Sequence, residues 1–153
     1  MKQIPLSQGK SALVDDEDYK YLMQWKWHFS NGYAIRSAQT PRPRKHIYMH
    51  RVVAKTPDEL EVDHINHNRV DNRKENLRNC TRRQNQHNQS VQKRKIFSQF
   101  KGVTKYRSKW VTRISINRIP IHIGYFENER HAAMAYDIWA KDLFGEYATL
   151  NFS

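Results

Sequence analysis

The stretch from residue 61 to residue 88 constrains the fold of this chain more than any other, because its local signals follow one another without a gap. Clusters of Asn, Asp, Arg and Lys between short apolar segments mark a loop between two strands. Thr81 and Gln84 match a capping box, which starts a helix. The predicted strand, loop, return strand and helix cover residues 61–65, 66–75, 77–80 and 82–88.

Several side chains of this stretch carry chemically useful groups. Asp63 offers a carboxylate and Asn85 an amide oxygen, and such oxygens hold a hard cation such as Mg²⁺. His64 can take a proton from a water molecule near neutral pH. Asn88 follows Asn85 by three residues and shares its helix face, so periodicity alone does not choose between them. These are the groups that hydrolysis of a phosphodiester with one metal ion requires.

The spacing of Asp63, His64, Asn76 and Asn85 resembles the HNH (His-Me finger) endonucleases, in the H-N-N variant of phage and intron-borne homing enzymes. The resemblance implies a ββα-metal module around one divalent cation, Mg²⁺ or Mn²⁺. In that module Asp63 and Asn85 are the metal ligands, His64 is the general base, and Asn76 positions the histidine. Many members carry His at the last position, and the Asn found here leaves open whether one strand or both are cut.

Neighbouring residues of the motif are interpreted more plainly. Asp71, Asn72 and Arg73 are expected to be structural turn residues, because Asn and Asp clusters usually form turns. The pair His50-Arg51 matches a pair often seen upstream of the motif in the same family. Arg51 either contacts DNA or only braces the fold, and the sequence leaves both readings open.

Positive charge is concentrated in one part of this chain, whose net charge is +12. From residue 76 to residue 126 there are twelve Lys and Arg residues and no Asp or Glu. Such a stretch is the footprint of a polyanion binder, here double-stranded DNA, although RNA binding, an anionic membrane surface or mere solubility also fits. The absence of an amphipathic basic helix disfavours the membrane. The expected DNA contacts from the nuclease half, the linker and the first hairpin are Arg51, Arg82, Lys93, Arg94, Lys95 and Arg107.

Residues 1–60 are predicted to form a small α+β module. The Asn31-Gly32 pair is typical of a tight turn, and it separates two strand-like segments. Trp25 and Trp27 are expected to be core and platform residues. A short helix, a β-hairpin, a strand and a second helix are expected near residues 15–23, 25–37, 45–49 and 50–55.

Residues 98–152 show three alternating, strand-like segments followed by a helix from Glu129 to Phe144. Asn128 is the expected N-cap of that helix and Gly145 its terminator. Strings such as Lys-Gly-Val, Lys-Trp, Gly-Tyr-Phe and Phe-Gly-Glu-Tyr-Ala-Thr-Leu-Asn-Phe make this segment resemble the plant APETALA-two (ethylene-response-factor) DNA-binding domain. The resemblance implies a three-stranded sheet lying in the major groove, which is wide enough for it.

The DNA-facing positions implied by this second resemblance are Lys101, Thr104, Tyr106, Trp110, Arg113, Ser115, Arg118 and His122. Several arginines of the plant pattern are replaced here, so the plant target sequence does not transfer. Trp110 is alternatively a core aromatic, and Arg113 and Arg118 alternatively belong to a solvated strand face. The helix alanines, Tyr136, Trp139 and Phe152 are expected in the core.

Length and composition set outer bounds. The chain has 153 residues and one cysteine, so an intrachain disulfide and a cysteine-based zinc site are excluded. No signal peptide and no apolar run long enough to cross a bilayer are present in the sequence. We therefore expect a cytoplasmic protein acting on DNA, with no obligate protein partner and with a monomer favoured.

The predicted architecture is α+β, a ββα-metal (His-Me finger) nuclease module followed by a three-stranded antiparallel sheet packed on one α-helix. An N-terminal module, the nuclease motif, a basic linker and the DNA-binding domain are expected at residues 1–60, 61–89, 90–98 and 99–153. The linker either lies along a phosphate backbone or is a solvated connector. The expected function is a metal-dependent DNA endonuclease of a phage or mobile element. The alternatives are a sequence-specific DNA-binding regulator with an inactive nuclease centre, and an RNA-binding or RNA-cleaving protein.

Overall fold

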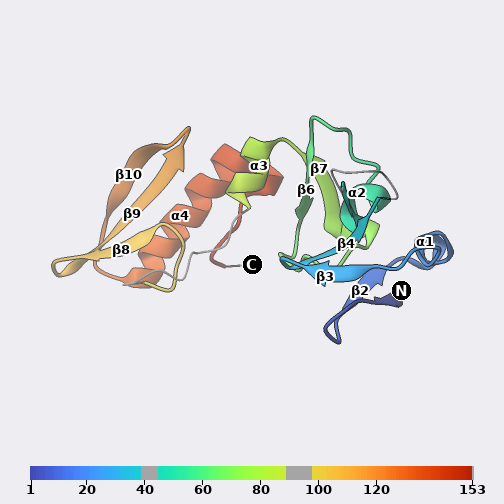
Figure 1. The fold of residues 1–153 in the computed structure, drawn as a ribbon. Coiled ribbons are helices and arrows are strands. Elements are labelled where there is room, and N and C mark those ends of the chain that lie inside the picture. Colours follow the sequence, from blue (N-terminus) through green and yellow to red (C-terminus); the bar gives the residue numbers. More distant parts are fainter. Residues whose placement is uncertain (39–44, 89–97, 153) are drawn as a thin grey trace. The chain divides into compact units, whose positions relative to one another are not determined.

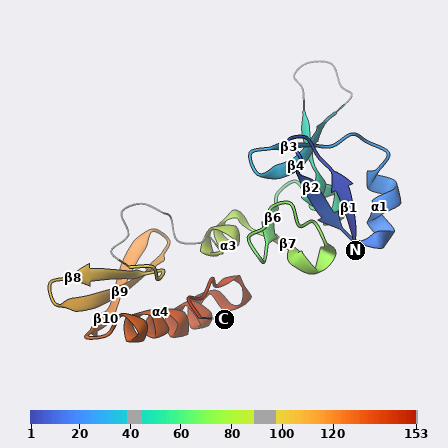
Figure 2. The same cartoon turned by 90° about the horizontal axis from the view of Figure 1, so that it is seen from below.

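The computed structural model describes residues 1–38, 45–88 and 98–152 of the chain. It divides into two compact units, Met1–Asn85 and Gln86–Ser153, called here the N-terminal and the C-terminal unit. Both units mix small sheets with few helices, as Figures 1 and 2 show. The residues predicted as a separate N-terminal module therefore share one compact unit with most of the predicted catalytic motif.

The N-terminal unit contains three small antiparallel sheets and two complete helices. Strand β1 pairs with β2, β4 lies between β3 and β5, and β6 pairs with β7. The bounds of the strands are Lys2–Pro5 (β1), Ser11–Val14 (β2), His28–Ser30 (β3), Tyr33–Ser37 (β4), His46–Tyr48 (β5), Glu61–His64 (β6) and Leu77–Cys80 (β7). The helices are α1 (Asp16–Leu22), α2 (Met49–Val53) and the short 3-10 helix η1 (Lys74–Asn76).

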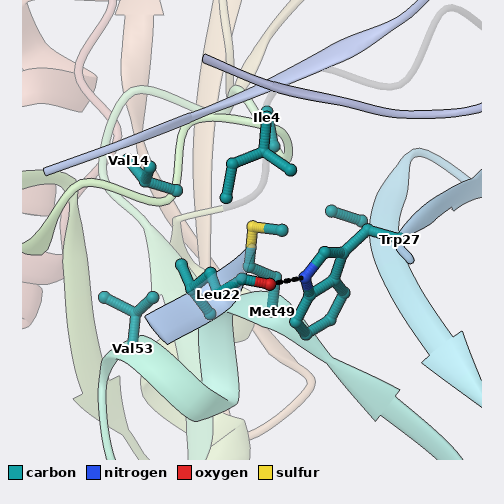
Figure 3. Packing of buried hydrophobic residues seen from close by; sticks show 8 residues of the cluster. Ile4, Val14, Leu22, Trp27, Met49 and Val53 are labelled. Atoms are coloured by element: carbon teal, nitrogen blue, oxygen red, sulfur yellow. Dashed lines mark hydrogen bonds between the residues drawn. The ribbon is translucent and has the colours of Figure 1, made fainter. Parts of the chain in front are cut away.

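One apolar core joins the first two sheets to both helices, as Figure 3 shows. The indole nitrogen of Trp27 donates a 2.8 Å hydrogen bond to the Leu22 carbonyl, which satisfies the polar atom of a buried ring. Leu77 of β7 packs against this core, so one face of the β6–β7 hairpin is turned toward it. The other core side chains are Ile4, Ala12, Val14, Ala34, Met49 and Val53.

The loop between β6 and β7 is held by the beginning of the chain. Leu13 of β2 accepts a hydrogen bond from the Asn72 amide and donates one to the Val70 carbonyl, both 2.8 Å long. Just beyond the loop, the Lys74 amide donates to the Asp15 carboxylate over 2.8 Å. This attachment joins residues far apart in sequence, and it fixes the loop that follows His64.

Helix α3 (Arg82–His87) follows β7 directly and starts at the expected capping box. The Gln84 side chain accepts from the Thr81 amide at 2.8 Å, and the Gln84 amide donates back to the Thr81 hydroxyl at 3.3 Å. Reciprocal capping of this kind satisfies N–H groups that a short helix otherwise leaves unpaired. The predicted strand, return strand and helix are therefore present with nearly the predicted bounds.

The C-terminal unit is an antiparallel sheet in the order β10-β9-β8 packed against one long helix. Figures 1 and 2 both show α4 running along the sheet. The Thr112 hydroxyl donates a 2.8 Å hydrogen bond to the Ala132 carbonyl, so small helix residues bring the two layers close together. The elements are β8 (Val103–Tyr106), β9 (Lys109–Ile116), β10 (Ile119–Phe126), α4 (Glu129–Phe144) and the 3-10 helix η2 (Gly145–Tyr147).

Helix α4 has the predicted ends. The Asn128 side chain accepts from the amides of Arg130 and His131, and Gly145 follows the last turn with a positive φ. Tyr136 is buried with Ala132, Ala133 and Ala140, as expected. Trp139 was expected in the core and is not there, because its ring is 42% exposed beside the exposed side chain of Ile138.

Candidate active site

Strand β6 presents its side chains alternately to two different surroundings, because the side-chain period of a strand is two. Asp63 meets the β7 residue directly across from it, Arg78, whose Nε and Nη2 donate to Oδ2 of Asp63 at 2.8 and 2.6 Å. Glu61 shares this face with Asp63. His64 and Val62 lie on the other face of the strand. Neighbours in sequence therefore enter two different environments.

His64 lies in a cluster of aromatic rings. Its ring centroid is 5.2 Å from that of His50 in an edge-on arrangement and 6.1 Å from that of Tyr33. His50 in turn stacks on Tyr48 at 5.3 Å. These rings come from β4, β5 and α2, which the sequence separates from His64 by the whole loop before β6. They hold the imidazole of His64 in a largely buried position.

The surroundings keep both imidazoles neutral at neutral pH. Burial lowers the pKa of His64, while the nearby Asn72 side chain and the charge of Asp63 oppose the shift. Burial, together with the nearby His64 and Arg51, lowers the pKa of His50 to about 3. A neutral imidazole is the form that can accept a proton, so His64 is suited to act as a base.

Asn76 ties down the loop that follows His64. Its Oδ1 accepts a 2.9 Å hydrogen bond from the Asn66 amide, and its Nδ2 donates to the Asp71 carbonyl at 2.8 Å. Its own carbonyl accepts from the Ile65 amide at 3.0 Å. One buried side chain therefore fixes the backbone immediately after His64 and closes the loop on itself.

Asp71 and Asn72 are buried structural residues of the same loop, as predicted. The Asp71 carboxylate accepts from Arg73 Nη2 at 2.7 Å and from Asn66 Nδ2 at 2.8 Å. The hydrogen bonds from Arg73 lower the pKa of Asp71 most, so the carboxylate stays ionised within the loop. Its charge is used to brace the turn.

Asn85 reaches β6 from helix α3. Its Nδ2 donates a 2.7 Å hydrogen bond to the Glu61 carboxylate. Because Glu61 and Asp63 share one face of β6, Asn85 approaches the face that carries Asp63. Asn88 instead accepts from Thr149 at 3.0 Å and belongs to the C-terminal unit, and His87 there stacks on Phe144.

The donor set around β6 suits a hard cation. Asp63 offers a carboxylate and Asn85 an amide oxygen, both typical of Mg²⁺ or Mn²⁺ sites that keep several waters. Within the described parts of the chain, no three side chains among His, Cys, Asp and Glu gather as a metal-holding group. Cys80 is buried and burial raises its pKa to about 11, so a thiolate ligand is not offered here.

A hollow of about 350 Å³ opens beside these residues. Tyr33 and His50, whose rings contact His64, lie on its wall, and so do Glu61 and Asn85 from the Asp63 side. The remaining lining residues are Tyr48, Arg51 and Val62. The hollow therefore adjoins residues from both surroundings of β6.

Arg51 braces the chain in this structure. Its guanidinium donates to the carbonyls of Leu60, Thr56 and Pro57 at 2.8, 3.4 and 2.7 Å, which fixes the turn before β6. Arg82 is exposed at the start of α3. The predicted contacts Lys93, Arg94 and Lys95 lie outside the described residues.

The C-terminal sheet gathers most of the predicted DNA-facing side chains on the face turned away from α4. In the register of the sheet, Arg113 of β9 lies opposite His122 of β10. Val111 of β9 lies between Tyr125 of β10 and Thr104 of β8. The ring of Tyr125 lies 4.7 Å from that of His122 and 6.2 Å from that of Tyr106, measured between centroids. The polar and aromatic side chains of this outer sheet face include Thr104, Tyr106, Arg113, Ser115, His122 and Tyr125, which lie around the buried Val111.

The other predicted contacts of this unit lie elsewhere. Arg107 and Arg118 are exposed in the two hairpin turns, both with positive φ. Trp110 packs against the apolar cluster of Val103, Ala132 and Ala133, which is the alternative that the sequence left open. The Lys101 ammonium donates to the His87 carbonyl at 2.8 Å, and burial lowers its pKa to about 8.

Sequence reasoning missed several residues of the site. Glu61 was treated only as part of a strand, and Arg78 only as part of the basic stretch. Tyr33 and Tyr48 carried no signal at all, since their contacts with His64 and His50 are made across the fold. The sequence singles out the pair His50-Arg51, but its spacing does not predict that the ring of His50 packs beside that of His64.

Comparison with known proteins gives the family. A family model described as HNH endonuclease matches residues 48–87, which include Tyr48, His50, β6, β7 and α3. An uncharacterized HNH endonuclease, L560, of the giant virus Acanthamoeba polyphaga mimivirus is 31% identical over 147 residues. The match covers 94% of this chain and 75% of that protein.

The chain therefore belongs to the HNH endonuclease family and is a hydrolase that cleaves DNA. HNH nucleases generally use a divalent metal ion. In the parts of the chain that the structure describes, no helix is long and apolar enough to cross a membrane.

Proposed function

We propose that this protein is a metal-dependent DNA endonuclease in which His64 is the general base and Asp63 and Asn85 hold one divalent cation, Mg²⁺ or Mn²⁺. The observation that carries the proposal is that Asn85 of α3 contacts Glu61 on the face of β6 that also carries Asp63. This contact brings Asn85 to the face of β6 from which Asp63 also projects, and His64 projects from the other face.

These groups match what phosphodiester hydrolysis with one metal ion requires. His64 takes the proton of the attacking water at an imidazole nitrogen, and Asp63 and Asn85 would hold the cation. When bound, the cation supplies charge stabilisation for the phosphate and for the departing 3′ oxygen. Asn76 acts as a positioning residue, because its hydrogen bonds fix the backbone that follows His64.

The C-terminal unit is the proposed DNA-holding part, similar to the plant APETALA-two domain. Support comes from its three-stranded sheet, whose outer face gathers Thr104, Arg113, Ser115 and His122 without any Asp or Glu in the strands. A sheet face can enter the major groove, and the flanking arginines can contact phosphates. Duplex DNA bound by a monomer, in a phage or mobile-element setting within a cell's cytoplasm, is the context we propose.

A plasmid-cleavage assay tests the catalytic assignment. Removing a general base costs roughly 10²–10⁴ in rate, so His64→Ala should lose cleavage and keep its affinity for DNA. EDTA should stop the wild-type enzyme and Mg²⁺ should restore it. A His64→Ala variant that cuts at near wild-type speed would show that the base is another group. Full activity in excess EDTA would rule out the metal.

The second candidate, a DNA-binding regulator with an inactive centre, is disfavoured by the same geometry. Asp63, His64 and Asn76 are buried and ordered by named contacts, which a degenerate site would not need to keep. The same assay separates the two, because a regulator would bind the plasmid at every Mg²⁺ concentration without nicking it.

A further inference from the structure

An arginine that the proposed mechanism does not use lies beside the aromatic wall of His64. Arg69 is exposed in the loop between β6 and η1, and its guanidinium carbon lies 4.9 Å from the centroid of the Tyr33 ring. The β3–β4 turn leaves room for it. A Cβ added at Gly32 would lie 3.4 Å from the Arg69 Cδ, and Gly32 has a φ of 88°.

The Tyr33 ring connects Arg69 to the reaction centre. Its other ring neighbours are His50 at 5.1 Å, Tyr48 at 5.7 Å and His64 at 6.1 Å between centroids. The guanidinium of Arg69 and the imidazole that we assign as the base therefore both lie next to the same ring.

The guanidinium of Arg69 is available to an anion. Asp71, the carboxylate nearest in sequence, is already bonded to Arg73 and Asn66. Among residues 1–38, 45–88 and 98–152, Arg69 makes no ion pair and no hydrogen bond; its described contact is the ring of Tyr33. Stacking uses the flat face of a guanidinium and leaves its N–H donors at the edge, where phosphate oxygens can be bound in pairs.

The loop that carries Arg69 is braced on both sides. Asn66 and Asp71 are joined to each other and to Asn76, and the Asn72 amide is bonded to Leu13 of β2. A cation carried by such a loop is preorganised, so its interaction with a developing charge costs little rearrangement.

We propose that Arg69, stacked on Tyr33, binds the phosphate that is being cleaved and stabilises the negative charge that grows on its oxygens. The inference rests on the proposed function and adds a residue to it. Arg69 donates hydrogen bonds only and transfers no proton, so His64 remains the acceptor of the water proton. Tyr33 is a positioning residue that acts through the guanidinium.

The test measures two quantities for full-length variants: the rate of single-turnover plasmid cleavage with Mg²⁺, and the Kd for duplex DNA without Mg²⁺. Arg69→Ala should slow cleavage by roughly 10²–10³, the loss typical of one preorganised donor, and change the Kd by less than about tenfold. Arg69→Lys should recover part of the rate, because it retains charge without the planar fork. Lys20→Ala, which removes one exposed positive charge from α1 in the same unit, is the matched control and should cut normally.

A second readout excludes a purely structural role. Added guanidinium ion at millimolar concentration should restore part of the rate of Arg69→Ala and none of the rate of His64→Ala. Tyr33→Phe keeps the ring and should stay active. Tyr33→Leu should reduce the cleavage rate more when it is made in the wild-type protein than when it is made in the Arg69→Ala variant, because the two residues act together. Should Arg69→Ala fail to fold, Arg69→Gln answers the same question.

The outcomes separate this inference from the function beneath it. A wild-type protein that never cuts DNA would overturn the proposed function itself. A wild type that cuts and a His64→Ala variant that does not, together with an Arg69→Ala variant at wild-type rate, would overturn only the role of Arg69. A loss confined to Kd, with the rate unchanged at saturation, would also overturn its assignment to the phosphate being cleaved.

Discussion

Asp63 and His64 show how two adjacent residues acquire different chemistry from their surroundings. Asp63 is paired with Arg78, whereas His64 is enclosed by His50 and Tyr33, and burial lowers the pKa of its imidazole. Each state suits the role proposed for it. Neither follows from residue type alone, because the partners come from β7 on one side and from β4 and α2 on the other.

Glu61 is predicted to matter for the metal without binding it. Glu61→Ala removes the acceptor that orients the Asn85 amide, so the Mg²⁺ concentration for half-maximal cleavage should rise about 10–100-fold. Glu61→Gln keeps an acceptor and should remain near wild type. Glu59→Ala, an exposed glutamate two residues earlier, is the control. An unchanged Mg²⁺ requirement in Glu61→Ala would mean that Asn85 is held by something else.

His50 is predicted to make the protein sensitive to acid. Its pKa is about 3 in the folded chain, against an ordinary 6.5, so the unfolded state binds the proton first as pH falls. The free energy of unfolding should therefore decrease between pH 6.5 and 3, by at most about 1.4 kcal/mol per pH unit from this group. Urea titrations at pH 7.5 and 5 measure the free energy of unfolding. The loss of this free energy between the two pH values should be smaller for His50→Phe than for the wild type. His46→Asn is the control, because it removes an exposed histidine from β5. It should show the same pH dependence as the wild type.

At the scale of the elements, the close approach of the C-terminal sheet to α4 depends on one glycine. Gly102 has a φ of 77°, and a Cβ placed there would lie 2.0 Å from Tyr136 Cδ2 and 2.7 Å from the Arg113 carbonyl oxygen. Its own carbonyl accepts the Arg113 amide at 2.8 Å. The alignment of β8 on β9 therefore depends on a residue that has no Cβ on the side occupied by Tyr136.

Gly102→Ala and Gly145→Ala form a matched pair of substitutions. Both positions have positive φ, but Gly145 has nothing within 4 Å of an added Cβ. Gly145→Ala should cost about 1–2 kcal/mol of backbone strain. Gly102→Ala should lower the free energy of unfolding by the same strain and by about 1–3 kcal/mol more from overpacking. It should also weaken DNA binding, because the strands shift. Thermal unfolding of both variants checks this; equal losses of Tm would mean that the contact with Tyr136 relaxes freely.

Local signals made these elements predictable, whereas contacts across the fold did not. The capping box of Thr81 and Gln84 and the N-cap at Asn128 each involve residues within a few positions, and both were found from the sequence. Strands β1 and β2, by contrast, contain too few residues to show a period. The wall of His64 and the position of Arg69 over Tyr33 depend on loops folding back, for which a single sequence carries no signal.

At the scale of the whole molecule, the charge distribution predicts how the affinity for DNA depends on salt concentration. The acid-free segment of residues 76–126 includes Arg113 on the outer sheet face and Arg107 and Arg118 in the two hairpin turns. If these contact phosphates, each contact releases counterions, and about six contacts give a log–log salt slope of roughly −5. Affinity should then fall steeply with salt.

Individual arginines should be visible in that slope. Arg113→Gln should reduce its magnitude by about 0.9, and joint replacement of Arg107, Arg113 and Arg118 by about 2.7. Lys141→Gln removes an exposed charge from α4 and should leave the slope unchanged. Filter binding between 50 and 300 mM salt, roughly the range over which such slopes are resolved, makes the comparison. Equal slopes for Arg113→Gln and Lys141→Gln would place the duplex away from the outer sheet face.

The attachment of the β6–β7 loop to the beginning of the chain bears on when the protein becomes active. The Lys74 amide is bonded to Asp15, 59 residues earlier, and Asn72 and Val70 are bonded to Leu13 of β2. Contacts of such long separation form late, because the intervening chain must close first. During synthesis the first hairpin therefore waits with an unpaired edge until the catalytic loop has left the ribosome. The backbone that follows His64 is therefore not fixed until about half of the 153 residues have been made.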